Sequence, residues 1–420
     1  MQNQSPPVAR IGMEELRKAA VDWEKLDAGN FGKEAVENFR EPLEHQLNAI
    51  NAAQNHFQNH NRGKLIMACG TGKTYTSLKI AEKLYPNGKI LFLVPSIALL
   101  SQTLYEWATF AENPFNYICV CSDETVSKKT EDEIKSVNLP LPATTNPNEI
   151  SRRMENFSDN MTVIFSTYQS LDKVSAAKID FDLIICDEAH RMTGYGKDAK
   201  AFTQVHDENF IRGKKRIYMT ATPRLYTSEA KKKAADNDLM LWSMDDAEIY
   251  GEEFFHLGFG DAVEKNLLSD YKVLILTVNK PLKVGDKKIS TDDKEKVTGC
   301  INALHKKLTD IEILGDPAPM KTAVGFCSRI NDSKNIAEEF KSQGISAVHV
   351  DGKMSSDYRS KQLSWLKETP ENDCRIITNA RCLSEGVDVP SLDAILFLSS
   401  KRSQVDIVQT VGRVMRKAPD

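Results

Sequence analysis

Residues 67–74 read MACGTGKT, and they lie between an apolar run at 65–67 and a helical pattern with Leu78, Ala81 and Leu84 on one face. A strand, a glycine turn and a helix in this order form a phosphate-binding loop. The glycines let the backbone approach the phosphates, and the loop and helix N-terminus direct N–H groups at them. A dinucleotide-binding loop is excluded because Tyr75 occupies the position of its third glycine. The stretch therefore predicts a nucleotide site in an α/β domain.

The side chains of this loop predict ATP and Mg²⁺ as cofactors. We expect the backbone of Gly70, Thr71 and Gly72 to hold the phosphates. Lys73 would reach the β- and γ-phosphates, and Thr74 would bind Mg²⁺. Upstream, Gln46 can read an adenine edge because its amide offers both a donor and an acceptor; the alternative is a solvated helix glutamine.

Composition indicates a globular protein of two or three domains. The chain has 420 residues, 41% of them hydrophobic and 27% charged, and its net charge is −4. No apolar run approaches the ~18–20 residues of a membrane span, so we expect no membrane association. The eight cysteines include no CxxC pair, which argues against a zinc site or a disulfide framework. We therefore expect free thiols in a reducing compartment, the cytoplasm. Because the net charge gives no global basic signal, a nucleic-acid site must be a local groove.

Apolar runs alternate with helical patterns twice along the chain, which predicts two doubly wound parallel-sheet lobes. We divide the chain into an N-terminal extension at 1–39, a first lobe at 40–250, a connecting region at 251–270 and a second, C-terminally truncated lobe at 271–420. Within the first lobe, polar residues 122–160 predict an insertion or long loop. Expected strands lie at 90–94, 117–121, 161–165, 181–186, 215–219, 273–278, 322–327, 346–350, 374–378 and 394–398, and expected helices at 291–314, 330–342, 356–367 and 404–416.

The sequence DEAH at 187–190 follows the buried run 181–186, at the strand end where a parallel sheet presents its ligands. A carboxylate there can hold Mg²⁺, and a neighbouring one can orient and deprotonate the attacking water. We assign Asp187 to the metal and Glu188 to the water. Residues 219–223, MTATP, end another strand, and their hydroxyls can relay hydrogen bonds from the carboxylates.

Residues 409–416, QTVGRVMR, place Arg413 and Arg416 three positions apart on one helix face. Two guanidinium groups on one face can clamp a γ-phosphate and stabilise charge in the transition state. The alternative is a basic helix end that satisfies the helix dipole.

The ordered set GTGKT, DEAH, TATP and QTVGRVMR resembles the core of superfamily 2 helicases and translocases. The resemblance implies two RecA-like lobes, an ATP site in the cleft between them, and arginine fingers at Arg413 and Arg416. It also implies a group of nucleic-acid contacts, mostly to the sugar-phosphate backbone. The residues it places at these contacts are Ser96, Thr167, Tyr168, Arg329 and Arg381, and the segment 378–390, with Gly386 and Asp388 at the nucleotide, would join the two sites.

Within that superfamily, residues 65–74, 165–171 and 243–251 are similar to the motor of single-chain type ISP restriction-modification enzymes. This resemblance implies ATP-driven translocation along duplex DNA. It also implies a nuclease, a methyltransferase and a target-recognition domain elsewhere in the full-length protein, so we expect neither cleavage nor methylation from these 420 residues. The rival functions are a strand-separating DNA or RNA helicase and a non-catalytic nucleic-acid sensor or scaffold.

Overall fold

The computed structural model describes two compact units, residues 1–129 with 133–261 and residues 130–132 with 262–420. The described residues are 40–121, 143–156, 160–194, 201–237, 241–269, 321–352, 354, 356–370, 373–380 and 392–399, with single positions 407 and 411. No helix in these ranges combines the length and the apolar run that a bilayer crossing requires.

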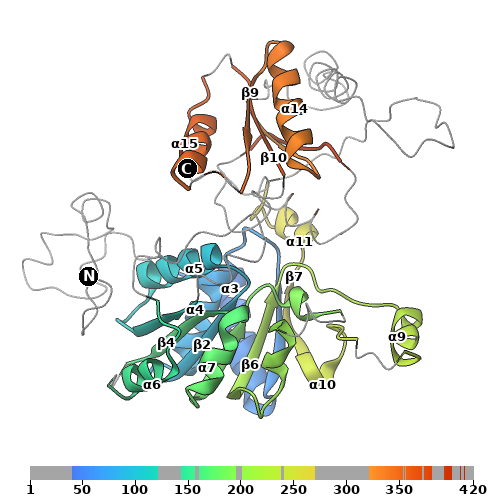
Figure 1. Ribbon diagram of the computed structural model, residues 1–420. Coiled ribbons are helices and arrows are strands. Elements are labelled where there is room, and N and C mark those ends of the chain that lie inside the picture. Colours follow the sequence, from blue (N-terminus) through green and yellow to red (C-terminus); the bar gives the residue numbers. More distant parts are fainter. Residues whose placement is uncertain are drawn as a thin grey trace, which may run out of the picture. The chain divides into compact units, whose positions relative to one another are not determined.

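The first unit contains a seven-stranded sheet in which all neighbouring strands pair in parallel (Figure 1). Its spatial order is β3-β4-β2-β5-β6-β1-β7. The central strands are nearly continuous apolar runs because helices cover both of their faces. The strands are β1 (Arg62–Met67), β2 (Lys89–Val94), β3 (Asn116–Val120), β4 (Thr162–Thr167), β5 (Asp180–Cys186), β6 (Arg212–Thr220) and β7 (Glu252–Leu257).

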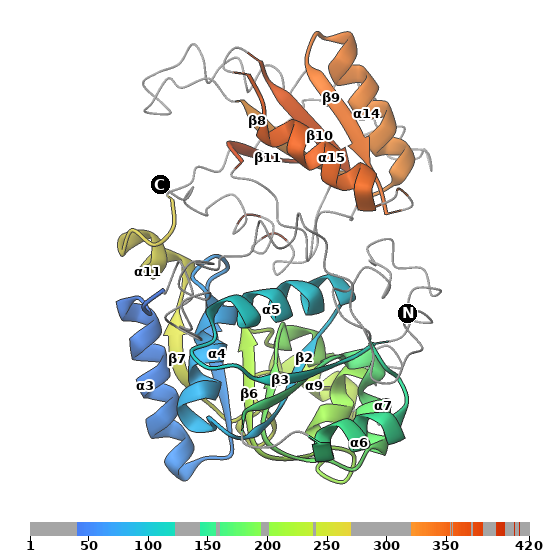
Figure 2. The same ribbon diagram turned by 90° about the vertical axis from the view of Figure 1, so that its left-hand side faces the viewer.

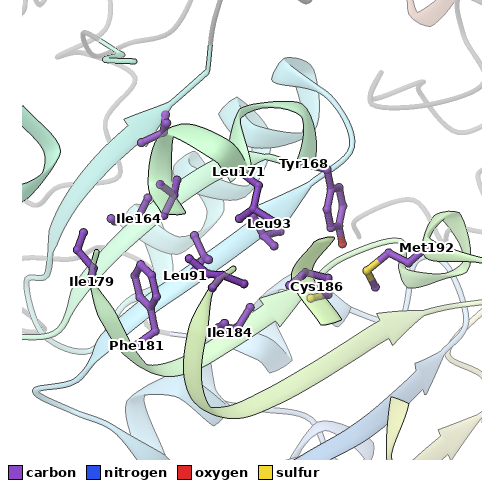
Figure 3. Packing of buried hydrophobic residues seen from close by; sticks show 14 of the residues in the cluster. Leu91, Leu93, Ile164, Tyr168, Leu171, Ile179, Phe181, Ile184, Cys186 and Met192 are labelled. Carbon is purple, nitrogen blue, oxygen red and sulfur yellow. The ribbon is translucent and has the colours of Figure 1, made fainter. Parts of the chain in front are cut away.

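Helices cover the two faces of this sheet, as the alternation of side chains along β2 illustrates. Leu91 and Leu93 join a cluster with residues of α6 (Pro147–Asn156) and α7 (Leu171–Ala176), which Figure 3 shows from close by. Between them, Phe92 points to the other face, where its ring meets Trp107 of α5 (Ile97–Phe110) edge to face. The helices α3 (Glu44–Asn59) and α4 (Lys73–Leu84) pack against each other and lie away from α6 and α7 (Figure 2).

Two predictions about this unit need correction. The polar segment 122–160 was expected to be an insertion or long loop, and the loop alternative is wrong for residues 147–156, which form α6 and pack through Ile150 and Met154. The expected connecting region at 251–270 contains β7, which pairs with β1 and therefore belongs to the first sheet. β7 lies at the sheet edge, where only part of a strand is buried. Its charged residues therefore interrupt the apolar pattern that predicts a strand. The remaining short elements are α9 (Ser228–Ala235), α10 (Ala247–Tyr250), α11 (Phe259–Glu264) and the 3₁₀ turns η4 (Tyr168–Ser170), η5 (Ala189–Met192) and η6 (Gln204–His206).

The second unit contains a four-stranded parallel sheet in the order β11-β8-β10-β9. Helix α14 (Ile330–Ser342) covers one face and α15 (Ser356–Lys367) the other, each over its own apolar cluster. The strands are β8 (Thr322–Phe326), β9 (Ser346–Val350), β10 (Arg375–Asn379) and β11 (Ala394–Phe397). The predicted α/β class is confirmed, while the expected strand at 273–278 and helices at 291–314 and 404–416 lie outside the described residues apart from positions 407 and 411.

Candidate nucleotide-binding site

The predicted phosphate loop connects β1 to α4. Gly70 and Gly72 both adopt left-handed backbone conformations, with φ of 87° and 85°. Glycine reaches this region without the steric cost that a Cβ imposes. Lys73 and Thr74 then open α4, so their amides lie among the N–H groups that a helix start leaves without intrahelical partners. The loop therefore has the backbone geometry that a phosphate-binding loop requires.

The order of the strands brings three sequence motifs to one edge of the sheet. Strands β5, β6 and β1 are neighbours, and they end at Cys186, Thr220 and Met67. DEAH, TATP and the phosphate loop follow directly after these ends. The carboxyl ends of parallel strands are where such folds bind ligands. The three motifs thus form one candidate site at the middle of the sheet edge.

Asp187 is held at both of its main-chain polar groups. Its N–H donates to the carbonyl of Leu93 at 2.9 Å, and its carbonyl accepts from the Tyr168 hydroxyl at 2.8 Å. Its side-chain Oδ1 accepts from the Glu188 N–H at 2.9 Å. The carboxylate position is therefore fixed before any ligand binds, which is the preorganisation that a metal or phosphate site requires.

The electrostatic surroundings of Asp187 connect it to the phosphate loop. Burial raises the pKa of the Asp187 carboxyl above its usual range, and the neighbouring charge of Glu188 raises it further. The ammonium group of Lys73 opposes this shift in pKa, so Lys73 of the loop and the Asp187 carboxylate interact electrostatically. A carboxylate of this kind, with the Thr74 hydroxyl and phosphate oxygens, suits Mg²⁺, which takes one or two protein carboxylates and keeps other oxygen ligands. The residues present therefore fit Mg²⁺-ATP.

Glu188 stands in a left-handed conformation, with φ of 50°, which is rare for a residue with a side chain. Its Oε2 lies 3.3 Å from His190 Nδ1, and that nitrogen is 3.0 Å from Thr220 Oγ1. Burial lowers the pKa of His190 to about 4, so the imidazole is neutral near pH 7 and its contact with Glu188 is not an ion pair. Thr220 Oγ1 in turn accepts from the Thr222 N–H at 3.1 Å. This chain connects the predicted water-activating carboxylate to the TATP motif.

Gln46 and its neighbour His45 brace the phosphate loop from α3. Both side chains are buried, and His45 Nε2 and Gln46 Nε2 lie 2.9 and 3.2 Å from the carbonyl oxygen of Thr71. Gln46 Oε1 accepts from the Leu43 N–H at 2.9 Å. A Cβ on Gly72 would come within 2.3 Å of Gln46 Nε2, so the glycine is needed for this close approach as well. Adenine contact by Gln46 stays a prediction.

The predicted nucleic-acid contacts of the first unit have structural tasks of their own. Ser96 caps α5 by accepting from the Leu99 N–H at 3.3 Å. Thr167 and Tyr168 are 2% and 1% exposed, and Thr167 donates to Ser170 Oγ at 3.2 Å. At this segment the exposed side chain is Gln169, so a passing phosphate backbone would meet Gln169 and the main chain.

In the second unit, Arg329 is exposed at the start of α14. The remaining predicted site residues, Arg381, Gly386, Asp388, Arg413 and Arg416, lie outside the described residues, so their roles stay predictions.

Comparisons with known proteins agree with this geometry. Residues 39–225 match the family described as "Type III restriction enzyme, res subunit", and residues 304–418 match "Helicase conserved C-terminal domain". The DNA-bound structure of the ATP-dependent type ISP restriction-modification enzyme LlaBIII is 38% identical, with a TM-score of 0.79 over 99% of this chain. The chain is a superfamily 2 helicase-type motor, close to those of type ISP enzymes.

Other relatives support the same family and show how much of each this motor spans. A nuclease-deletion mutant of the type ISP enzyme LlaGI, in complex with a DNA substrate mimic, is 35% identical with a TM-score of 0.64 over 89% of the motor. "Probable helicase A859L" of African swine fever virus (strain Badajoz 1971 Vero-adapted) is 29% identical over 373 residues, 89% of the motor. The motor spans 29% of the LlaBIII chain, 26% of the LlaGI chain and 39% of the viral protein.

Sequence reasoning missed His45 and the positioning role of Tyr168 in this motor. Both act through main-chain carbonyls that are 26 and 19 residues away, so no local pattern marks them. For His45, the available signal was its place beside Gln46 at the start of a helix that packs on α4.

The brace predicts the effect of Gln46→Ala on nucleotide use. Because the amide is buried and already bonded to main-chain groups, we expect KM to rise by the same factor for ATP and GTP. A factor of about ten corresponds to the loss of one buried hydrogen bond. Steady-state kinetics with both nucleotides measure this, with Asn48→Ala on the exposed side of the same helix as the control. A rise in KM for ATP alone would instead mean that Gln46 reads the adenine.

Proposed function

We propose that this motor is an ATP-dependent double-stranded DNA translocase of a restriction-modification enzyme, which hydrolyses ATP with Mg²⁺ to move along DNA. The observation that carries the proposal is that the phosphate loop follows β1 while Asp187 and Glu188 follow β5, at the same edge of the sheet on either side of β6. The likeness to LlaBIII, an ATP-dependent enzyme whose structure is bound to DNA, supports the choice of duplex DNA.

In the proposed reaction, the residues of the first unit bind and orient the nucleotide. Backbone amides of Gly70, Thr71 and Gly72 hold the phosphates, and Lys73 neutralises their charge. Thr74 and Asp187 would hold Mg²⁺, which would supply Lewis-acid stabilisation of the phosphate oxygens. Glu188 orients the attacking water and takes its proton, and the contact of its Oε2 with His190 Nδ1 at 3.3 Å fixes the direction of the carboxylate.

The second unit completes the proposed site. Arg413 and Arg416 stabilise the charge that develops on the transferring phosphoryl group, as arginine fingers do. Gly386 and Asp388 contact the nucleotide. We infer that the first lobe binds ATP and that the second supplies the groups that speed its hydrolysis.

The proposed DNA contacts are to the phosphate backbone and require no basic bulk charge. We assign them to Ser96, the segment of Thr167 and Tyr168, Arg329 and Arg381. In the full-length protein we expect a nuclease, a methyltransferase and a target-recognition domain as partners of the motor, in the cytoplasm. A strand-separating helicase is the second candidate, because the viral relative is described as a probable helicase.

The test is the ATPase rate with duplex DNA, single-stranded DNA and RNA at matched salt. We expect duplex DNA to give the largest stimulation, and we expect the stimulation to fall steeply with salt because backbone contacts release counterions. Equal or better stimulation by RNA would favour the helicase. An absence of ATP hydrolysis under every condition would favour a non-catalytic sensor or scaffold.

A further inference from the structure

A buried polar chain crosses the carboxyl edge of the second sheet. His349 is the next-to-last residue of β9. Its Nε2 lies 3.0 Å from Asp351 Oδ2, and its Nδ1 lies 2.7 Å from Ser333 Oγ. Ser333 Oγ lies 3.0 Å from Thr378 Oγ1, which donates to the Ser333 carbonyl at 2.8 Å. Ser333 and Thr378 are 0% exposed, and the side chains of His349 and Asp351 are 8% and 4% exposed. Polar groups this deeply buried are costly unless their hydrogen bonds are made.

The geometry resembles a Ser-His-Asp catalytic triad, but it has no access for a substrate. Ser333 lies within α14 and is fully buried, and its hydroxyl is shared between His349 and Thr378. A nucleophile must reach a carbonyl or phosphoryl atom in a site open to its substrate. The arrangement therefore has a structural role, which is to hold segments of the second unit together.

The chain joins three segments that are far apart in sequence. Ser333 lies one turn into α14, and its N–H donates to the carbonyl of Arg329. Asp351 directly follows β9 and opens the segment 351–354. Thr378 lies beside His349 in the register of β10 with β9, immediately before residues 379–390. Two of these segments adjoin predicted nucleic-acid contacts, Arg329 at the start of α14 and Arg381 three residues after Thr378.

We propose that His349 is a positioning residue that fixes the spacing of these three segments for contact with the DNA backbone. The inference rests on the proposed function. Phosphates recur along DNA at a fixed spacing, so contacts from separate loops add only if the loops hold a fixed separation. The imidazole of His349 contacts a different segment through each of its two ring nitrogens. Two such contacts from one rigid ring fix the distance between the segments more firmly than a single hydrogen bond would. His349 contacts Asp351 on one side and, through Ser333, both α14 and β10 on the other.

Three variants of His349 separate its two bonds. Alanine removes both. Glutamine can place an amide near the position of Nε2 and keep the bond to Asp351, whereas asparagine can reach only the position of Nδ1 and keep the bond to Ser333. The matched control is His256→Ala, because His256 forms an exposed pair with Glu253 at 2.7 Å on β7 of the other unit.

The experiment measures two quantities in the whole chain, the DNA concentration for half-maximal ATPase stimulation and amide hydrogen exchange at residues 351–354 and 378–380. For His349→Ala we expect the half-maximal concentration to rise about 10- to 100-fold, the range for loss of one charge-assisted hydrogen bond. We expect the ATPase rate without DNA to stay unchanged, and faster exchange confined to the two segments. His349→Gln should recover more of the DNA response than His349→Asn, and His256→Ala should behave as wild type.

Unchanged DNA response and unchanged exchange in His349→Ala would overturn the proposal. Faster exchange spread over the whole second unit would also overturn it, because the residue would then only stabilise the fold. If the wild-type protein shows no response to DNA, the proposed function fails, while the exchange measurement still decides whether His349 holds the segments together.

Discussion

Replacement of Glu188 by glutamine is expected to lower the ATPase turnover by roughly 10²–10⁴-fold, the contribution typical of a general base, with little change in ATP affinity. The amide keeps the size of the carboxylate and can keep the contact with His190. It cannot take a proton from water. Turnover and nucleotide affinity, measured separately by steady-state kinetics and equilibrium binding, give the two quantities.

The matched comparison is Asp187→Asn, which should weaken Mg²⁺-dependent ATP binding itself because Asp187 is assigned to the metal. Glu253→Gln, an exposed acid at the sheet edge, controls for the loss of a negative charge. If Glu188→Gln abolished nucleotide binding and left the turnover of residual bound ATP unimpaired, the two assigned roles would be wrong.

Replacement of Arg416 by alanine is expected to lower turnover by roughly 10³–10⁵-fold, the contribution of an arginine finger. The guanidinium meets charge that develops only in the transition state, so ATP affinity should fall much less, since Lys73 and Mg²⁺ already neutralise the ground-state phosphates. Arg413→Ala should show the same division between turnover and affinity, because both residues lie on the predicted helix face.

Lys417→Ala is the control for this pair, since it removes a positive charge next to Arg416 in the sequence. A basic helix end without a catalytic role would respond alike to all three substitutions, and the effects would be small. Comparable turnover for Arg416→Ala and Lys417→Ala would therefore contradict the proposed arginine-finger role of Arg416.

Much of the fold follows from local patterns in the sequence. The apolar runs that predict buried strands form β2, β4, β5 and β6 in the structure, and the predicted helix at 330–342 forms α14. These elements are predictable because a strand buried on both faces must be apolar throughout, and an amphipathic helix must repeat its apolar face. The edge strand β7 and helix α6 were missed because their polar faces meet solvent, which weakens both signals.

The functional motifs were predictable for a different reason. Few residue types can adopt a positive φ beside a phosphate or supply a pair of carboxylates at a strand end. The motifs are therefore recognisable from residue type and spacing alone. The supporting contacts were not predictable in this way. Tyr168 reaches the carbonyl of Asp187, His45 reaches that of Thr71, and His349 joins three segments. Such contacts depend on which strands become neighbours, and local patterns in a single sequence do not reveal that order.

Displacement of a triplex-forming strand from a duplex measures whether this motor moves along intact duplex DNA, as we propose. We expect ATP-dependent displacement, lost in Lys73→Ala and Glu188→Gln, with the two strands of the underlying duplex still paired afterwards. Separation of those strands, or ATP hydrolysis on duplex DNA without any displacement of the third strand, would contradict that proposal.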